Sequence, residues 1–444
     1  MLSVIILAAG QGTRMFSHTP KILHQVVGKP IVHHVLDAAL ALDPQEVITV
    51  ISPHVCASSV VGERAVKVAI QEHPRGTGDA VRSGLGHLSN SQGDVLIVCG
   101  DTPLIQVDEL VHLLAEHRLH PENSISVLGM RLNDPRQYGR IVADGKNLNC
   151  IVEYKDATDV ERQINLCNTG IIITSIATLK NLLPKLTCNN SAQEYYLTDI
   201  IELANKQSIN RYVVESKNPD LFHGVNNRVE LAIAERQYQA ILRDKIMRSG
   251  VTLLDPDTIY FNHDTIIGKD TTIYPNVFFG EEVVVGEGAT IYPSCYLVKT
   301  RLGNQTKIGP FAHLREYTIL EDNAEIGNFV EVKKSTLGKA AKAKHLTYLG
   351  DAIIGAKANI GAGVITCNYD GISKHQTIIG ERAFIGSNSS LIAPVSIGED
   401  AIVGAGSAIT NDVPAQALGI ARGKQEVKLN WTKSFHQNYE KIKG

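Results

Sequence analysis

The stretch IGERAFIGSNSSLIAPVSIGEDAIVGAGSAI, residues 379–409, places an aliphatic residue at every sixth position: Ile379, Ile385, Leu391, Ile397, Val403 and Ile409. Neither a helix nor an ordinary strand repeats every six residues. A triangular coil does, because each flat face takes about six residues and the aliphatic side chain points to the axis. Glycine, which suits a tight corner, often follows the aliphatic residue, as at Gly380, Gly386, Gly398 and Gly404.

The same period runs through most of the C-terminal half. One series is Ile267, Ile273, Phe279, Val285, Ile291 and Leu297, and after a slip of one position a second is Leu302, Ile308, Leu314, Leu320, Ile326 and Val332. A segment of roughly residues 365–377 does not repeat, and a loop that leaves a regular coil suggests a function. We therefore predict a parallel β-helix of hexapeptide repeats with a C-terminal tail over residues 250–444.

The N-terminal half has a different pattern. Apolar runs at residues 4–7, 47–51, 66–70 and 95–99 are typical of buried strands, and helical spacing separates them at 32–42 and 107–119. This alternation predicts a Rossmann-like α/β domain with a mostly parallel sheet over residues 1–225. Residues 226–249 follow helical spacing and are expected to form a linker helix that Gly250 ends.

Composition limits the possible partners and compartments. The 444 residues carry a net charge of −3, which gives no reason to expect nucleic acid or a membrane surface as a partner. The seven cysteines are scattered and form no CxxC pair, which is typical of reduced thiols in a cytoplasmic protein. The apolar residues 2–9 lack a charged lead and are expected to form a buried strand instead of a signal peptide.

A phosphate-binding loop is expected directly after the first predicted strand. Residues 7–15 read LAAGQGTRM and are followed by Pro20 and Lys21. The glycines let backbone N–H groups approach a phosphate, and Arg14 and Lys21 add positive charge. Asp101 follows the strand at 95–99 and can supply a carboxylate to Mg²⁺, with Asn226 as a second oxygen ligand.

These motifs resemble those of the sugar-1-phosphate nucleotidyltransferases. Over nearly the whole chain, the resemblance is to the bifunctional family that acetylates glucosamine-1-phosphate and then uridylylates N-acetylglucosamine-1-phosphate, which feeds peptidoglycan and lipopolysaccharide precursor synthesis. The resemblance implies a left-handed β-helix, UTP and acetyl-CoA as co-substrates, and Mg²⁺. For the first site it implies substrate contacts at Leu7, Ala8, Ala9, Gly10, Arg14, Lys21, Gln71, Gly76, Thr77, Cys99, Gly100, Asp101 and Asn226, with the sugar at Gly139, Glu153 and Asn168.

A polar cluster in the coil has no packing explanation. Arg315 and Lys333 are eighteen residues apart, so in a coil of three six-residue faces they lie one above the other and suit an anionic ligand. His345 lies between Lys333 and Tyr348 in the sequence, and an imidazole suits the removal of a proton from an amine at neutral pH.

This half resembles the left-handed β-helix acyltransferases. The resemblance implies that His345 is the catalytic base and that Arg315, Lys333, Tyr348 and Asn359 bind the amino-sugar phosphate. It implies acetyl-CoA contacts at Ala362, Asn368, Tyr369, Ser387, Ala405 and Arg422. It also implies a homotrimer with acetyltransferase sites shared between subunits. The family commonly has proline after the residue that matches Arg315, whereas Glu316 here adds a negative charge near the expected phosphate.

Two other readings remain open. A nucleotidyltransferase with one active site could carry the coil for assembly or regulation. A non-catalytic scaffold could be built on the same two domains. The set His345, Lys333, Tyr348 and Asn359 argues against the first alternative, and the constellation of Arg14, Lys21 and Asp101 argues against the second.

Overall fold

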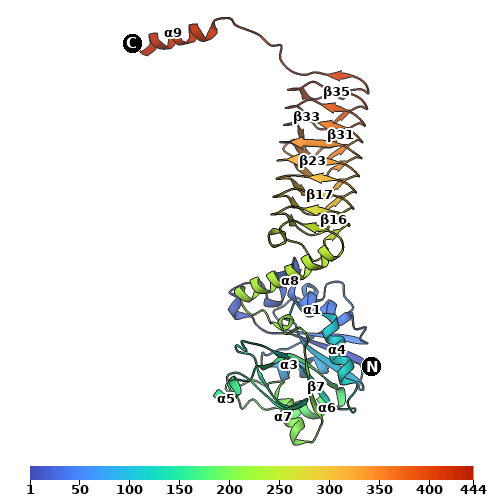
Figure 1. Ribbon diagram of the computed structural model, residues 1–444, viewed down its shortest axis with the longest axis vertical. Helices are drawn as coiled ribbons and strands as arrows, with labels where there is room; N and C mark the ends of the chain where they lie inside the picture. Colours follow the sequence, from blue (N-terminus) through green and yellow to red (C-terminus); the bar gives the residue numbers. More distant parts are fainter. Residues whose placement is uncertain (444) are drawn as a thin grey trace. The chain divides into compact units, whose positions relative to one another are not determined.

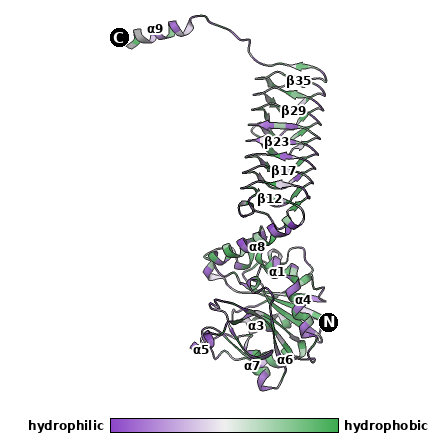
Figure 2. Ribbon diagram, viewed as in Figure 1, coloured by the Kyte–Doolittle hydropathy of each residue, from purple (hydrophilic) through white to green (hydrophobic). Residues whose placement is uncertain are grey.

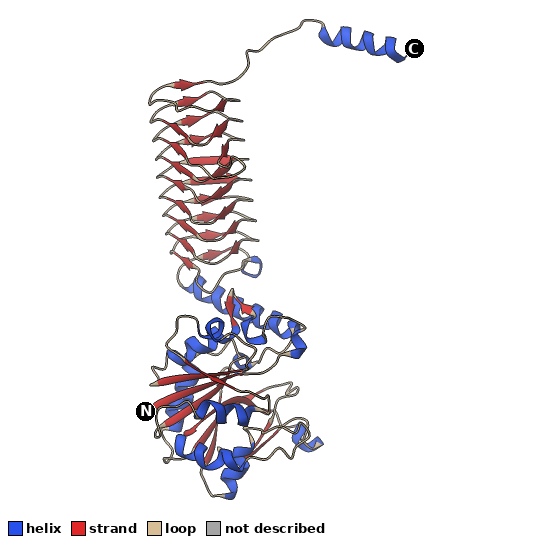
Figure 3. Cartoon of the chain, turned by 180° about the vertical axis from the view of Figure 1, so that it is seen from behind, coloured by secondary structure: helices blue, strands red, loops and turns tan. Residues whose placement is uncertain are grey.

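The computed structural model describes residues 1–443 and divides the chain into two compact units, residues 1–241 and 242–444. The boundary falls inside the long helix α8 (Arg228–Arg248). None of the described helices has the length and apolar character needed to cross a bilayer. Figure 1 colours the chain from one end to the other, and Figure 3 shows the same chain by secondary structure.

The first unit contains a nine-stranded sheet in the order β5-β4-β1-β6-β10-β7-β11-β9-β8. Its strands are β1 (Leu2–Ala8), β4 (Glu46–Ile51), β5 (Lys67–Ile70), β6 (Asp94–Cys99), β7 (Ile125–Arg131), β8 (Arg140–Asp144), β9 (Asn147–Val152), β10 (Leu166–Ser175) and β11 (Arg211–Glu215). The half formed by β5, β4, β1 and β6 is parallel, as predicted. The other half is mixed, because β10 runs antiparallel to both β6 and β7.

Successive residues of β1 point to opposite sides of the sheet, and helices cover the apolar side chains on both faces. Val4 and Ile6 share a core with α1 (Ile31–Leu40) and α4 (Val107–His117). Ile5 shares a second core with α3 (Thr77–Leu85), α6 (Ile176–Leu182) and α7 (Asp199–Lys206). Figure 2 shows hydrophobic residues along these strands. All three helices predicted from spacing are present as α1, α4 and α8, within two residues of their expected ends.

The second unit is the β-helix that the period of six predicts, with the left hand that the resemblance implies. Three parallel sheets form its faces: ten strands from β12 (Thr252–Leu253) to β37 (Leu418–Gly419), eight from β13 (Ile266–Ile267) to β34 (Val395–Ile397), and eight from β15 (Phe278–Phe279) to β36 (Ala408–Ile409). The periodic residues fill the axis, as shown by the full burial of Ile291, Leu314 and Leu391. Helix α9 (Trp431–Lys443) lies beyond the coil in the sequence.

The loop that interrupts the coil is shorter than the sequence predicts. Residues 365–367 form strand β30, which pairs with β33 (Ser390–Ile392), and β31 (Thr377–Ile379) resumes the coil. The departure is therefore residues 368–376. Thr366 is fully buried although it is polar, because its hydroxyl bonds to the backbone of Gly350, and this polar core position hides the repeat in the sequence.

Candidate functional sites

The first cavity, of about 590 Å³, lies at the carboxyl ends of the parallel strands β1, β5 and β6. Ligands bind at this edge in open α/β sheets. Of the residues expected to bind nucleotide, it is lined by Leu7, Ala8, Ala9, Gly10, Arg14, Lys21, Gln71, Gly76, Thr77, Cys99, Asp101 and Asn226. Gly100 lies directly behind it and donates its N–H to Leu7 O at 2.8 Å.

Lys21 joins the two candidate metal ligands. Its Nζ lies 2.5 Å from Asp101 Oδ2 and 3.2 Å from Asn226 Oδ1. The lysine side chain is only 10% exposed, so the ion pair is held away from solvent. Gly12 permits this arrangement, because its φ is +62° and a Cβ there would lie 2.5 Å from Lys21 Cβ.

The oxygen atoms at this point suit Mg²⁺. Asp101 and Asn226 offer a carboxylate and an amide oxygen, and both side chains line the cavity. Mg²⁺ commonly takes one or two protein oxygens and completes its shell with water and substrate phosphates. Among the side chains that the structure describes, no group of three or more His, Cys, Asp or Glu could hold a metal. Asp101 and Asn226 alone would leave the other positions around Mg²⁺ to water and substrate phosphates.

The loop before α3 is fixed by side-chain hydrogen bonds. Gln71 is buried, and its Nε2 donates to Gly76 O and Asp79 Oδ2, both at 3.1 Å. Thr77 Oγ1 accepts the N–H of Leu197 at 2.9 Å. A Cβ at Gly76 would lie 2.7 Å from Tyr195 O. Residues 71–77, which form one wall of the cavity, therefore pack closely against neighbouring backbone atoms.

A second cavity, of about 240 Å³, shares Leu7, Thr77, Cys99, Asp101 and Asn226 with the first. It brings together the three residues expected to hold the sugar: Gly139, Glu153 and Asn168. Gly139 O accepts the N–H of Asn168 at 2.9 Å, and a Cβ at Gly139 would lie 3.3 Å from Glu153 Oε2. The regions expected to hold nucleotide and sugar are thus neighbouring parts of one site.

Burial raises the pKa of two groups in this site. Desolvation raises the pKa of Glu153, although a hydrogen bond from the Thr198 hydroxyl at 3.1 Å opposes it. Desolvation, together with the charge of Asp101, raises the pKa of Cys99 to about 12. Cys99 is therefore a neutral thiol at neutral pH and is not suited to nucleophilic attack.

In the β-helix, one long edge carries His345 at the end of β26 (Lys342–His345). Backbone hydrogen bonds stack the following turns of the coil above His345. The N–H of Gly363 donates to His345 O, the N–H of Asn388 donates to Ala362 O, and the N–H of Gly406 donates to Ser387 O. Arg422 Nη1 donates to Ala405 O at 2.9 Å. The expected base and four expected acetyl-CoA contacts therefore lie along one edge: His345, Ala362, Ser387, Ala405 and Arg422.

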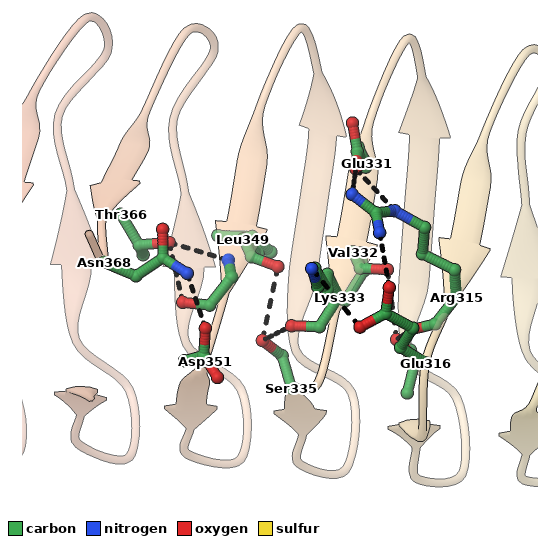
Figure 4. Close-up of polar contacts among 12 residues, drawn as sticks. Arg315, Glu316, Glu331, Val332, Lys333, Ser335, Leu349, Asp351, Thr366 and Asn368 are labelled. Atoms are coloured by element: carbon green, nitrogen blue, oxygen red, sulfur yellow. Dashed lines mark hydrogen bonds and ion pairs between the residues drawn. The ribbon is translucent and has the colours of Figure 1, made fainter. Parts of the chain in front are cut away.

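A neighbouring edge of the β-helix carries the cations. Arg315, at the end of β21 (His313–Arg315), pairs in register with Lys333, at the end of β24 (Glu331–Lys333), as the eighteen-residue spacing predicts. Lys333 pairs in turn with Gly350 of β27 (Tyr348–Gly350). Asn368 lies one turn further, and its Nδ2 donates to Asp351 Oδ2 at 2.5 Å. Figure 4 shows these residues.

The chain holds the base and the cations apart. Strand β27 follows His345 closely and ends beside Lys333, so about 10 Å of strand separates the two edges. The side chain of Tyr348 extends along β27 toward the cation edge, since a Cβ at Gly350 would collide with the Tyr348 hydroxyl and with the Asn368 amide. Asn359 pairs with Lys342 in the sheet that contains the His345 strand. Tyr369 is exposed on the loop.

Comparisons with known proteins agree with both halves. Residues 4–135 match the family profile of a MobA-like NTP transferase domain, and residues 376–411 match a hexapeptide repeat of succinyl-transferase. The bifunctional protein GlmU of Sphingopyxis alaskensis is 46% identical over 443 residues, covering 100% of this chain and 98% of that protein. The chain belongs to the GlmU family. GlmU of Paramagnetospirillum magneticum is 45% identical, covering 98% of this chain and 96% of that protein.

Several neighbours of these GlmU-type sites were not singled out from the sequence. Asn328 Oδ1 lies 2.7 Å from His345 Nδ1, and Thr198 bonds to Glu153. Asp351 holds Asn368, and Lys374 of the loop lies close to Lys333. Asn328 could have been found, because it lies one coil turn before His345 and pairs with it in register. Asp351 also lies in the coil, between β27 and β28 (Ala352–Ile354), whereas Thr198 and Lys374 come from segments without a repeating pattern.

Proposed function

We propose that this chain makes UDP-N-acetylglucosamine in two steps. The β-helix transfers an acetyl group from acetyl-CoA to glucosamine-1-phosphate, and the α/β unit then joins the product to UTP and releases pyrophosphate. One observation carries the assignment of the first unit: the nucleotide and sugar cavities share the loop residues Asp101 and Asn226. Membership of a family of bifunctional nucleotidyltransferases and acetyltransferases supports the pairing of activities.

In uridylyl transfer, a phosphate oxygen of the sugar phosphate attacks the α-phosphorus of UTP, and the bond to pyrophosphate breaks. Both reactants are anions, so the site must offset their repulsion and the charge that develops in the transition state. Arg14 and Lys21 supply fixed positive charge at the cavity wall. Asp101 and Asn226 would hold Mg²⁺, whose chemistry here is to bind and neutralise phosphate oxygens.

In acetyl transfer, the amine nitrogen of the sugar attacks the thioester carbonyl, and the C–S bond breaks. His345 accepts the proton that the nitrogen loses, and the CoA sulfur leaves as the thiol once protonated. Asn328 Oδ1 accepts a hydrogen bond from His345 Nδ1–H and so leaves Nε2 as the basic nitrogen. Arg315 and Lys333 bind the sugar phosphate at the neighbouring edge.

A homotrimer with shared acetyltransferase sites is part of this proposal. Exposed apolar residues recur along one face of the coil, including Ile319, Ile353 and Ile378, each with between 42% and 45% of its surface accessible. Such columns suit contact with another protein surface. A second copy could also complete the site between the separated edges. A cytoplasmic location fits the seven free cysteines of the described chain.

The decisive experiment follows two products separately. The purified chain is incubated with glucosamine-1-phosphate, acetyl-CoA, UTP and Mg²⁺, and free thiol and pyrophosphate are measured. We expect both products, with pyrophosphate dependent on acetyl-CoA. If N-acetylglucosamine-1-phosphate gives pyrophosphate but glucosamine-1-phosphate gives no thiol, the coil is structural and the enzyme has one active site.

A further inference from the structure

Glu316 lies in a turn of unusual backbone conformation at the cation edge. The turn between β21 and β22 (Thr318–Leu320) holds one more residue than the turn above it: four positions lead from Arg315 to Ile319, but three lead from Lys333 to Thr336. Glu316 and Tyr317 both have positive φ, +49° and +65°. Non-glycine residues rarely adopt this conformation, and two in succession fix the direction of the Glu316 side chain.

The Glu316 carboxylate bridges both cations of the expected phosphate site. Its Oε1 accepts from Arg315 Nη1 at 2.8 Å, and its Oε2 lies 3.3 Å from Lys333 Nζ. Arg315 makes a second ion pair, at 2.7 Å, with Glu331. Figure 4 shows the carboxylate between the two positive groups. Without a ligand, these contacts offset the repulsion between stacked cations.

The surroundings keep Glu316 charged and the edge net positive. Partial burial acts to raise the pKa of Glu316, but the hydrogen bond from Lys333 and the charges of Lys333 and Arg315 lower it overall. Lys334 and Lys374 also face this group of side chains. The described cations Arg315, Lys333, Lys334 and Lys374 outnumber the carboxylates of Glu316, Glu331 and Asp351, so an anionic ligand remains favoured.

We propose that Glu316 is a built-in counter-anion of the acetyltransferase site, which a sugar phosphate must displace from Arg315 and Lys333. The inference rests on the proposed acetyl transfer to an amino-sugar phosphate. A dianionic phosphate competes well against a single carboxylate, whereas weakly charged ligands do not. Glu316 therefore holds the cations in place before binding, lowers the affinity for the amino sugar and favours a doubly charged phosphate.

The test is Glu316→Gln, which keeps the shape and removes the charge. We expect the KM for glucosamine-1-phosphate to fall about fivefold, the scale of a partly exposed ion pair. The kcat and the KM for acetyl-CoA should stay within twofold. Inorganic phosphate, as a competitor of the amino sugar, should bind more tightly by the same factor. If Glu316 had only a structural role, its substitution would not lower the KM for the amino sugar while leaving the KM for acetyl-CoA unchanged.

Glu282→Gln is the matched control. Glu282 occupies the corresponding turn lower in the coil, has a φ of +56°, and pairs with Lys299 at 3.7 Å. Glu282→Gln should leave the KM values for glucosamine-1-phosphate and acetyl-CoA unchanged. Glu316→Asp, which shortens the reach of the carboxylate, should give an intermediate KM for the amino sugar.

Two results would overturn the inference. An unchanged KM for glucosamine-1-phosphate in Glu316→Gln would show that the carboxylate does not compete with substrate. A higher KM or a large fall in kcat would show that Glu316 supports binding or catalysis. Failure of the proposed function looks different, because the unmodified chain would then release no thiol with glucosamine-1-phosphate, whatever the variants do.

Discussion

The imidazole of His345 is oriented through one nitrogen. Nδ1 contacts Asn328 Oδ1, which accepts but does not donate, so the second nitrogen is left to accept a proton. The exposed position on the coil edge gives a substrate access to it. The proposed role of His345 as a base therefore depends on Asn328, one turn below, and we expect a substitution at either residue to affect acetyl transfer first.

We expect His345→Ala to lower the kcat of acetyl transfer by roughly 10²- to 10⁴-fold, the usual contribution of a general base. Uridylyl transfer should stay close to that of the unmodified chain, because no residue of the first two cavities belongs to the coil. Thiol release and pyrophosphate release measure the two effects. His263→Ala in the first turn is the control. Normal acetylation by His345→Ala would remove this residue from the mechanism.

Substitution of Asp101 should lower uridylyl transfer and spare acetyl transfer, the reverse of His345→Ala. Asp101→Ala removes the carboxylate that pairs with Lys21 and a proposed Mg²⁺ ligand, so uridylyl transfer should fall by about 10²-fold or more. Acetyl transfer should not change. Titration with Mg²⁺ provides a second measurement, and Asp108→Ala, an exposed carboxylate in α4, is the control. Unchanged Mg²⁺ dependence in Asp101→Ala would place the metal elsewhere.

At the scale of elements, the β-helix was easier to predict than the loops that carry its chemistry. Leu314 and Ile326 are periodic because each fills the same axial position, and burial follows directly. The pairing of Arg315 with Lys333 also follows from the period. Glu316 lies between Leu314 and Leu320, where the period of six is kept, but its contacts depend on two positive φ angles that the sequence does not specify. Glu153 likewise meets Thr198 only because distant segments pack together.

Helix α7 contains a pH-sensitive residue at its start. Burial raises the pKa of Asp199 to about 6, with help from the negative charges of Glu202 and Asp156. Because the folded-state pKa is raised, the native state holds the proton more tightly than the unfolded chain, and this contribution to stability is lost as pH rises through about 6.

Asp199→Asn should therefore stabilise the first unit at pH 7.5 by about 1 kcal/mol, a value reduced for solvent screening of a half-buried group. The gain should shrink as the pH falls towards 4.5. Urea unfolding of the unmodified full chain and of Asp199→Asn at both pH values measures the difference in their free energy of unfolding. An equal gain at both pH values would show that the charge of Asp199 is not its cause.

At the scale of the whole molecule, the proposed trimer sets an expected mass. Light scattering should give about 145 kDa, three times the 48.3 kDa of one chain. Dilution to the monomer should abolish acetyl transfer and spare uridylyl transfer, because the nucleotide and sugar cavities are lined by one chain. A monomer with full acetyltransferase activity would contradict sites shared between subunits.

The last two turns or so of α8, from Leu242 to Arg248, close the first end of the coil. Leu242 and Ile246 pack against its core, and Arg243 donates to Ile259 O at 2.9 Å. A fragment that starts at residue 250 would leave this apolar end uncovered, together with the unpaired edges of its first strands. Such ends can join one fragment to the next and produce fibres. A shortened acetyltransferase must therefore begin before Leu242 to remain dispersed in solution.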